Sequence, residues 1–219
     1  MSNNSKKGVI FGATEKIGSY LAYHISKRGG EIILQDKTES GLEKLSKRLK
    51  KINNKQTFLY CDHSKIENFS KIDLVIARKF KKLDFVISCI GKIDSLRPIG
   101  NLNTNEWKNL IDQNLTLNWY ILKKTEVFLQ KSKKPCLFFF SNEELSRGTP
   151  YFNACSVSHG ALKTLISIYK KEKEKFNYNI KIIDVDKNEL SFLSHVLKKT
   201  VESKSQKKTN NLIEEIFQN

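Results

Sequence analysis

Residues 8–36 have the sequence GVIFGATEKIGSYLAYHISKRGGEIILQD, and this stretch decides the fold. Its apolar run at 9–11 leads into a turn that begins at Gly12 and closes at Gly18. A helical pattern follows, stops at two glycines, and gives way to a second apolar run that ends in the carboxylate of Asp36. Strand, glycine turn, helix and strand in this order predict one βαβ unit of a parallel sheet.

The glycine turn has the form of a phosphate-binding loop. Gly12 and Gly18 would let the backbone turn sharply and approach a diphosphate, which then lies at the positive end of the helix. One glycine of the usual motif is replaced by Glu15 or Lys16, depending on which spacing is matched. Either side chain crowds a phosphate; Glu15 adds like charge, whereas Lys16 can pair with a phosphate oxygen. The turn alone therefore supports dinucleotide binding and a purely structural role about equally.

Composition indicates one domain and argues against a polyanion partner. The chain has 219 residues, of which 39% are hydrophobic, and this is enough for a sizeable core. A formal net charge of +16 attracts nucleic acid or anionic membranes. The cations are nearly all lysines, however, and they are scattered with no basic block among aromatic residues. We interpret these lysines as residues spread over solvated helix faces and expect no nucleic-acid partner.

The same analysis predicts the compartment and excludes a metal site. No signal peptide precedes the first strand, and no apolar run approaches the length of a membrane span. The four cysteines show no CxxC pairing, which is typical of reduced thiols. Cys155 and His159 form a C-x-x-x-H half-site, but no other residues stand at a companion spacing. We expect a cytoplasmic protein with no membrane contact and no metal.

The rest of the chain continues the alternation of strand and helix. Apolar runs at 57–61, 85–90, 136–140 and 180–185 are separated by helical patterns, with one long helix at 103–130 and another at 151–176. Ser40 with Glu43, and Asn103 with Glu106, have the spacing of capping boxes at helix starts. This pattern predicts an α/β fold with a Rossmann-type, doubly wound, mostly parallel sheet of about six strands. We assign residues 1–190 to that domain and residues 191–219 to a helical C-terminal tail.

This layout resembles the short-chain dehydrogenase/reductase (SDR) family as far as about Val185. Residues 12–18 resemble its TGxxxGxG loop, and residues 88–91 stand where the family has NNAG. Trp107 and the segment 113–115 resemble its W…NL helix, and Asp62 stands where an aspartate contacts adenine. The resemblance implies an NAD(P)-binding oxidoreductase, with NAD favoured by Asp36 and NADP left open. The residues it implies for cofactor binding are Gly12, Thr14, Lys16, Ile17, Gly18, Asp36, Asp62, Cys89, Gly91 and His159.

The catalytic positions depart from the family. Its members use a tyrosine, a lysine, a serine and an asparagine; alignment with its YxxSKaAL segment puts Cys155 at the tyrosine position and His159 at the lysine position. Asn142 then takes the serine position, next to Ser141, and only Asn114 is kept. A thiol cannot reach where a tyrosine hydroxyl lies, and a neutral imidazole supplies no permanent charge beside the acid.

Several interpretations therefore stay open at this stage. The first is an SDR-type oxidoreductase whose turnover on an unknown small molecule is impaired or non-standard. The second is a non-catalytic, nucleotide-binding scaffold protein, and the third is a basic nucleic-acid-associated protein. Cys155 and His159 could also form a nucleophilic pair, and Asn114 could be a core amide satisfied by backbone. The resemblance further implies a homo-oligomer, commonly a dimer, formed through the long helix and the helix after the fifth strand.

Overall fold

The computed structural model describes residues 5–62, 65–92, 96–142, 145, 147–185 and 204–218. One parallel sheet organises this part of the chain, with the strand order β3-β2-β1-β4-β5-β6. The strands are β1 (Lys7–Phe11), β2 (Glu31–Asp36), β3 (Gln56–Tyr60), β4 (Phe85–Ser88), β5 (Cys136–Ser141) and β6 (Asn179–Asp184). The order reverses between β1 and β4, which is the switch point where open α/β sheets bind ligands. The prediction of a Rossmann-type, doubly wound sheet is confirmed.

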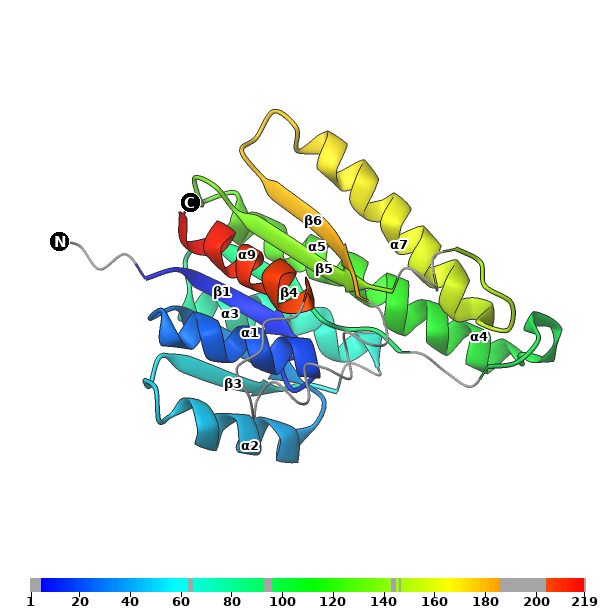
Figure 1. The fold of residues 1–219 in the computed structure, drawn as a ribbon, viewed down its shortest axis with the longest axis horizontal. Coiled ribbons are helices and arrows are strands. Elements are labelled where there is room, and N and C mark those ends of the chain that lie inside the picture. Colours follow the sequence, from blue (N-terminus) through cyan, green and yellow to red (C-terminus); the bar gives the residue numbers. More distant parts are fainter. Residues whose placement is uncertain are drawn as a thin grey trace.

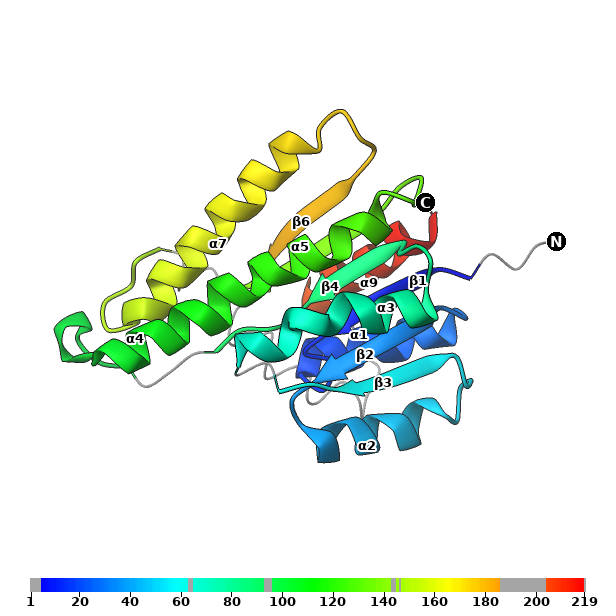
Figure 2. The same cartoon turned by 180° about the vertical axis from the view of Figure 1, so that it is seen from behind.

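Helices cover both faces of the sheet (Figures 1 and 2). One face carries α1 (Lys16–Lys27), α2 (Glu39–Leu49) and α9 (Lys204–Gln218); the other carries α3 (Ile72–Lys79), α5 (Leu117–Leu129) and α7 (Asn153–Glu172). Successive residues of β1 alternate between the two cores: Val9 and Phe11 pack with the α3, α5 and α7 face, and Ile10 with the α1, α2 and α9 face. Burial on both faces explains why the strands are almost continuously apolar.

The last helix belongs to this packing. Leu212, Ile213 and Ile216 of α9 are buried in the core beside α1, and Glu214 pairs with Arg28. The boundary proposed between residues 190 and 191 lies outside the described residues and stays a prediction.

The turn between β1 and α1 requires glycine at positions 12 and 18. Gly12 has a φ of +72°, a backbone conformation that favours glycine. A Cβ atom on Gly18 would lie only 2.2 Å from the Gly12 carbonyl oxygen. The first turn of α1 therefore packs directly onto the strand end, and this contact fixes the direction in which the helix leaves the sheet.

The long helix predicted at 103–130 is present, and a π-helical turn interrupts its α-helical geometry. It consists of α4 (Thr104–Ile111), a π-helical turn η3 (Asp112–Thr116) and α5. The capping box of Asn103 and Glu106 is present at the start of α4. The box predicted at Ser40 is wrong, because Asp36 accepts a hydrogen bond from the Thr38 backbone N–H (3.1 Å) and α2 begins at Glu39.

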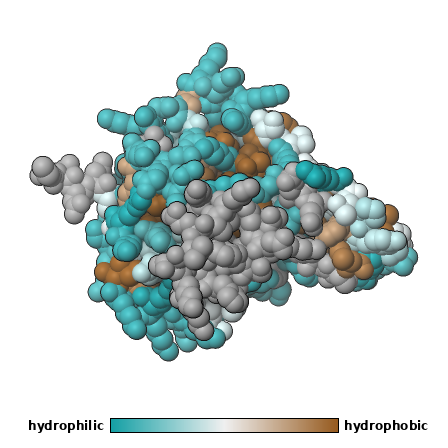
Figure 3. All heavy atoms as spheres, in the orientation of Figure 1, coloured by the Kyte–Doolittle hydropathy of each residue, from teal (hydrophilic) through white to brown (hydrophobic). Residues whose placement is uncertain are grey.

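The described surface is mostly hydrophilic on the side shown in Figure 3, with apolar residues gathered only in small areas. Two short 3-10 turns, η1 (Ile66–Lys71) and η2 (Ile99–Asn101), complete the connections. Within the part of the chain that the structure describes, no helix is both long and apolar enough to span a bilayer.

The contact between Gly18 and Gly12 makes a testable prediction. We expect Gly18→Ala to lower the free energy of unfolding by about 2 kcal/mol, because the new methyl group overlaps a backbone oxygen. Gly160 of α7 is the matched control, since nothing lies within 4 Å of a Cβ built there. Gly160→Ala should raise stability by about 0.5–1 kcal/mol. Urea unfolding of both variants checks this, and equal effects would contradict it.

Candidate functional site

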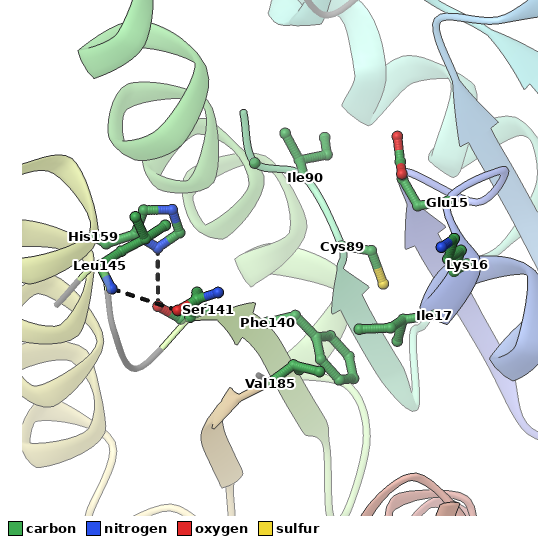
Figure 4. Close-up of a pocket in the computed structure, with 12 residues that line it drawn as sticks. Glu15, Lys16, Ile17, Cys89, Ile90, Phe140, Ser141, Leu145, His159 and Val185 are labelled. Carbon is green, nitrogen blue, oxygen red and sulfur yellow. Dashed lines mark hydrogen bonds between the residues drawn. The ribbon is translucent and has the colours of Figure 1, made fainter. Parts of the chain in front are cut away.

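A cavity of about 290 Å³ opens at the carboxyl ends of β1, β4 and β5, at the switch point of the sheet. Its wall combines an apolar part with a few polar side chains, the usual composition of a small-molecule site. The lining residues are Glu15, Lys16, Ile17, Cys89, Ile90, Gly91, Phe140, Ser141, Asn142, Leu145, His159 and Val185. Figure 4 shows the glycine loop on one side and α7 on the other.

A hydrogen-bonded pair forms the polar wall on the α7 side. The Ser141 Oγ lies 2.9 Å from the His159 Nδ1, and the imidazole is 5% exposed (Figure 4). Burial lowers the pKa of His159 to about 4; Asp184 opposes this shift and Lys163 adds to it. The ring is therefore neutral at pH 7. Its Nε2 makes no hydrogen bond to any residue that the structure describes.

The opposite wall carries charge. Glu15 and Lys16 project from the loop between β1 and α1. Burial and the neighbouring Asp36 raise the pKa of Glu15, and Lys37 and Lys16 lower it. Burial also raises the pKa of the Cys89 thiol, with further contributions from Glu15 and Asp36, so this thiol stays neutral.

Asn114 lies in the π-helical turn and does not line the cavity. Its Oδ1 accepts a hydrogen bond from the Lys92 backbone N–H (2.6 Å), and its Nδ2 donates to the Lys92 carbonyl (3.0 Å) and to the Ser158 Oγ (3.1 Å). The Asn114 amide thus links the segment after β4 to α7, the helix that carries His159. These contacts are those of a core amide satisfied largely by backbone.

The Asp36 carboxylate is also engaged in hydrogen bonds within the fold. Its two carboxylate oxygens accept hydrogen bonds from the backbone N–H groups of Thr14 (2.9 Å) and Thr38 (3.1 Å), and the residue is 2% exposed. Asp62 follows β3, at the far edge of the sheet from β4, and its carbonyl accepts from Asn68 (2.7 Å). Neither aspartate lines the cavity.

Cys155 lies in a small apolar cluster between α4 and α7 rather than on the cavity wall. It is 1% exposed, and its neighbours in the cluster include Leu110, Leu145 and Phe152. Its sulfur contacts the Lys92 carbonyl oxygen at 3.6 Å. Its neighbour on the same helix face, His159, points instead to Ser141.

The structure therefore gathers some of the predicted residues and separates others. Those that line the cavity are Lys16, Ile17, Cys89, Gly91, Asn142 and His159. Those that shape the glycine loop behind it are Gly12, Thr14 and Gly18, and those that lie elsewhere are Asp36, Asp62, Asn114 and Cys155. The roles assigned to all of them remain predictions.

Sequence reasoning missed the bond between Ser141 and His159. The two residues are 18 positions apart, so no local spacing pairs them. It also gave no role to Phe140, Leu145 and Val185, which supply apolar lining. Position in the chain is the signal for two of them: Phe140 is next to last in β5, and Val185 directly follows β6, so both lie at the carboxyl edge of the sheet. Leu145 lies in the connection after β5. Among the described residues, no group of three metal-ligating side chains is present.

Comparisons with known proteins agree on one family. A family model described as "short chain dehydrogenase" matches residues 6–186. A 3beta-hydroxysteroid dehydrogenase of Mediterraneibacter gnavus is 24% identical over 157 residues, which cover 72% of this chain and 56% of that protein. An oxidoreductase of Staphylococcus epidermidis is 25% identical over 126 residues, or 53% of its length, so this chain spans about half the length of such relatives.

Solved structures share the fold. A short chain dehydrogenase from Shigella flexneri superposes with a TM-score of 0.81 and 17% identity, over 96% of this chain and 85% of that one. A structure from Shigella flexneri 2a str. 301, described as a short chain dehydrogenase complexed with NADP, gives a TM-score of 0.82 and 16% identity over 97% and 91% of the two chains.

The neutral state of His159 gives the site a measurable pH dependence. Its pKa is lowered in the folded chain, so its contribution to stability is complete above pH 6.5 and is lost as the pH falls towards 4. We expect about 2–3 kcal/mol of acid destabilisation from this residue. His159→Gln should therefore lose less stability than the wild type between those pH values, as measured by urea unfolding. The pKa of His24, a half-buried histidine of α1, is also lowered, by burial and by Lys27, Arg28 and Arg48, so His24→Gln should show a smaller change of the same sign. An identical pH dependence of wild type and His159→Gln would contradict the prediction.

Proposed function

Since the chain belongs to the short chain dehydrogenase family, whose model matches residues 6–186, we propose that it binds NAD(P) along the glycine loop and the cavity. We propose further that its turnover as an oxidoreductase is impaired or non-standard. The observation that carries this proposal is the composition of the cavity wall. Among the described residues, the wall contains a dinucleotide-compatible loop but no tyrosine, and Lys16 is its one lysine.

The glycine loop fits a dinucleotide in shape. A Cβ on Gly18 would overlap the Gly12 carbonyl oxygen, and a Cβ on Gly12 would lie 3.1 Å from the Cys89 backbone, so the turn has the tight glycine form of a diphosphate-binding loop. The N-terminus of α1 directs N–H groups outward, and Lys16 can pair with a phosphate oxygen. The similar fold of the Shigella flexneri 2a short chain dehydrogenase complexed with NADP supports the proposed binding of NAD(P). A bound nicotinamide would supply a hydride.

The residues of this chain do not supply the usual proton donor. Cys155 is buried away from the cavity, and His159 is neutral and hydrogen-bonded to Ser141. A Tyr-Lys pair works because a fixed ammonium lowers the pKa of the phenol. The described wall has no phenol, and its one ammonium, that of Lys16, lies on the glycine-loop side, opposite α7. Proton transfer to a substrate oxygen would have to come from a weaker donor. Ordinary carbonyl reduction is therefore expected to be slow.

The same observations support the second candidate, a non-catalytic nucleotide-binding or scaffold protein. This candidate shares the cofactor and differs only in the complete absence of turnover. The choice between NAD and NADP stays open, because both carboxylate oxygens of Asp36 already accept hydrogen bonds from backbone. The substrate is a small molecule of unknown identity.

Kinetics with a ketone panel separates these possibilities. We expect wild-type reduction with NADH or NADPH to be at least about 100-fold slower than by an active family member, because general acid catalysis contributes about that much. Cys155→Ala should leave this rate unchanged. Rapid wild-type turnover would contradict impaired catalysis, and a fully inactive chain that still binds NADH would favour the scaffold protein.

We also propose that the chain forms a homo-oligomer through α5 and α7. A groove between these helices is lined by Trp119, Leu165 and Ile168 among others, and Trp119 and Ile168 are 41% and 51% exposed. We expect Ile168→Lys to shift the protein to monomers in sedimentation velocity. Leu74→Lys on α3 is the control, since Leu74 is similarly exposed but does not line the groove. A monomeric wild type would contradict the proposal.

A further inference from the structure

The side chain of Glu15 does not cap the helix whose first turn it precedes. It stands at the N-cap of α1 in an extended conformation, but its side chain makes no capping hydrogen bond. The loop is closed by its backbone instead: the Glu15 N–H donates to the Gly12 carbonyl (3.2 Å), and the Glu15 carbonyl accepts from Ser19 (2.8 Å). The carboxylate is left to line the cavity (Figure 4).

The surroundings of this carboxylate are unfavourable to its charge. Burial is the largest cause that raises the pKa of Glu15, and Asp36, a second carboxylate at the end of β2, raises it further. Lys16 on α1 and Lys37 after β2 act in the opposite direction but do not compensate. The groups that face it from the rest of the wall, the Cys89 thiol and the His159 imidazole, are neutral at pH 7.

A negative charge at this place opposes an anionic ligand. The N–H groups at the start of α1 offer a positive partial charge to a diphosphate, and a carboxylate at the N-cap cancels part of it. This local effect runs against the net charge of +16, which attracts anions to the molecule as a whole. Attraction at long range and repulsion at the loop therefore come from different residues.

We infer that Glu15 is a specificity-determining residue that weakens the binding of dinucleotides, so that affinity rises when its carboxylate is removed or protonated. This inference rests on the proposed binding of NAD(P) at the glycine loop. It assigns opposite roles to two neighbours: Lys16 strengthens the binding of the diphosphate, and Glu15 weakens it. The protein would accordingly bind its cofactor more tightly in mildly acidic solution than at neutral pH.

Isothermal titration calorimetry with NAD⁺ tests the inference on the full chain, because NAD⁺ is stable in mild acid. At about pH 7.5, Glu15→Gln should bind NAD⁺ roughly tenfold more tightly than the wild type, since one like charge near the diphosphate is removed. Lys16→Gln should bind more weakly than the wild type. Glu39→Gln on α2 is the matched control, because Glu39 is exposed, as Glu15 is, but does not line the cavity.

The pH dependence supplies an independent measure. Because the pKa of Glu15 is raised, lowering the pH to about 5 protonates part of the carboxylates, and wild-type affinity should rise towards that of Glu15→Gln. The affinity of Glu15→Gln should change less over the same range. Thermal melting of each variant at both pH values establishes that the proteins compared are folded.

The possible outcomes distinguish a failure of the inference about Glu15 from a failure of the proposed NAD(P) binding. If wild type and Glu15→Gln bind NAD⁺ equally at both pH values, the role of Glu15 is wrong and the cofactor assignment stands. If neither folded protein binds NAD⁺ or NADP⁺ at either pH, both the cofactor assignment and the inference are overturned. Tighter binding by Glu39→Gln equal to that by Glu15→Gln would show a general charge effect and would also overturn the inference.

Discussion

The rest of the structure depends on the contact between the first turn of α1 and the end of β1. Gly18 lies so close to the Gly12 carbonyl that a single methyl group would overlap it. This contact aims the N-terminus of α1 at the switch point between β1 and β4, and the cavity opens there. The fold requires glycine at both positions, and a tight glycine turn at a helix N-terminus suits a diphosphate. Structural necessity and ligand binding therefore favour the same glycines, which is why the turn alone does not distinguish the two roles.

Much of the fold is predictable from local patterns. The continuous apolar runs and the helical spacing between them predict a parallel sheet covered on both faces, since each such pattern is set by burial. The π-helical turn was not predicted; it contains Asn114, whose hydrogen bonds to Lys92 and Ser158 join residues that are distant in sequence. The start of α2 was mispredicted although the contact there is local: the Asp36 carboxylate accepts a hydrogen bond from the Thr38 N–H, and α2 begins at Glu39, so Ser40 lies inside the helix.

The site is less predictable than the fold. Strand ends indicate which residues reach the carboxyl edge of the sheet, and Cys89, Gly91 and Asn142 do line the cavity. Hydrogen bonds across the sheet are not encoded locally, so the pair of Ser141 and His159 had no signal in the sequence. For Cys155 the sequence misleads in the opposite direction. The resemblance implies a place in the active site, but the residue is buried in an apolar cluster and does not line the cavity.

The central claim is that this chain keeps a dinucleotide site although Cys155 and His159 of α7 stand where the family has its tyrosine and lysine. A crystal structure after soaking with NAD⁺ tests the claim most directly. The account predicts a diphosphate over residues 12–18 and a nicotinamide beside Cys89 and Gly91, with no tyrosine hydroxyl within hydrogen-bonding distance of the ring's reactive face. NAD⁺ bound elsewhere, or a tyrosine and a lysine brought together beside the nicotinamide, would contradict it.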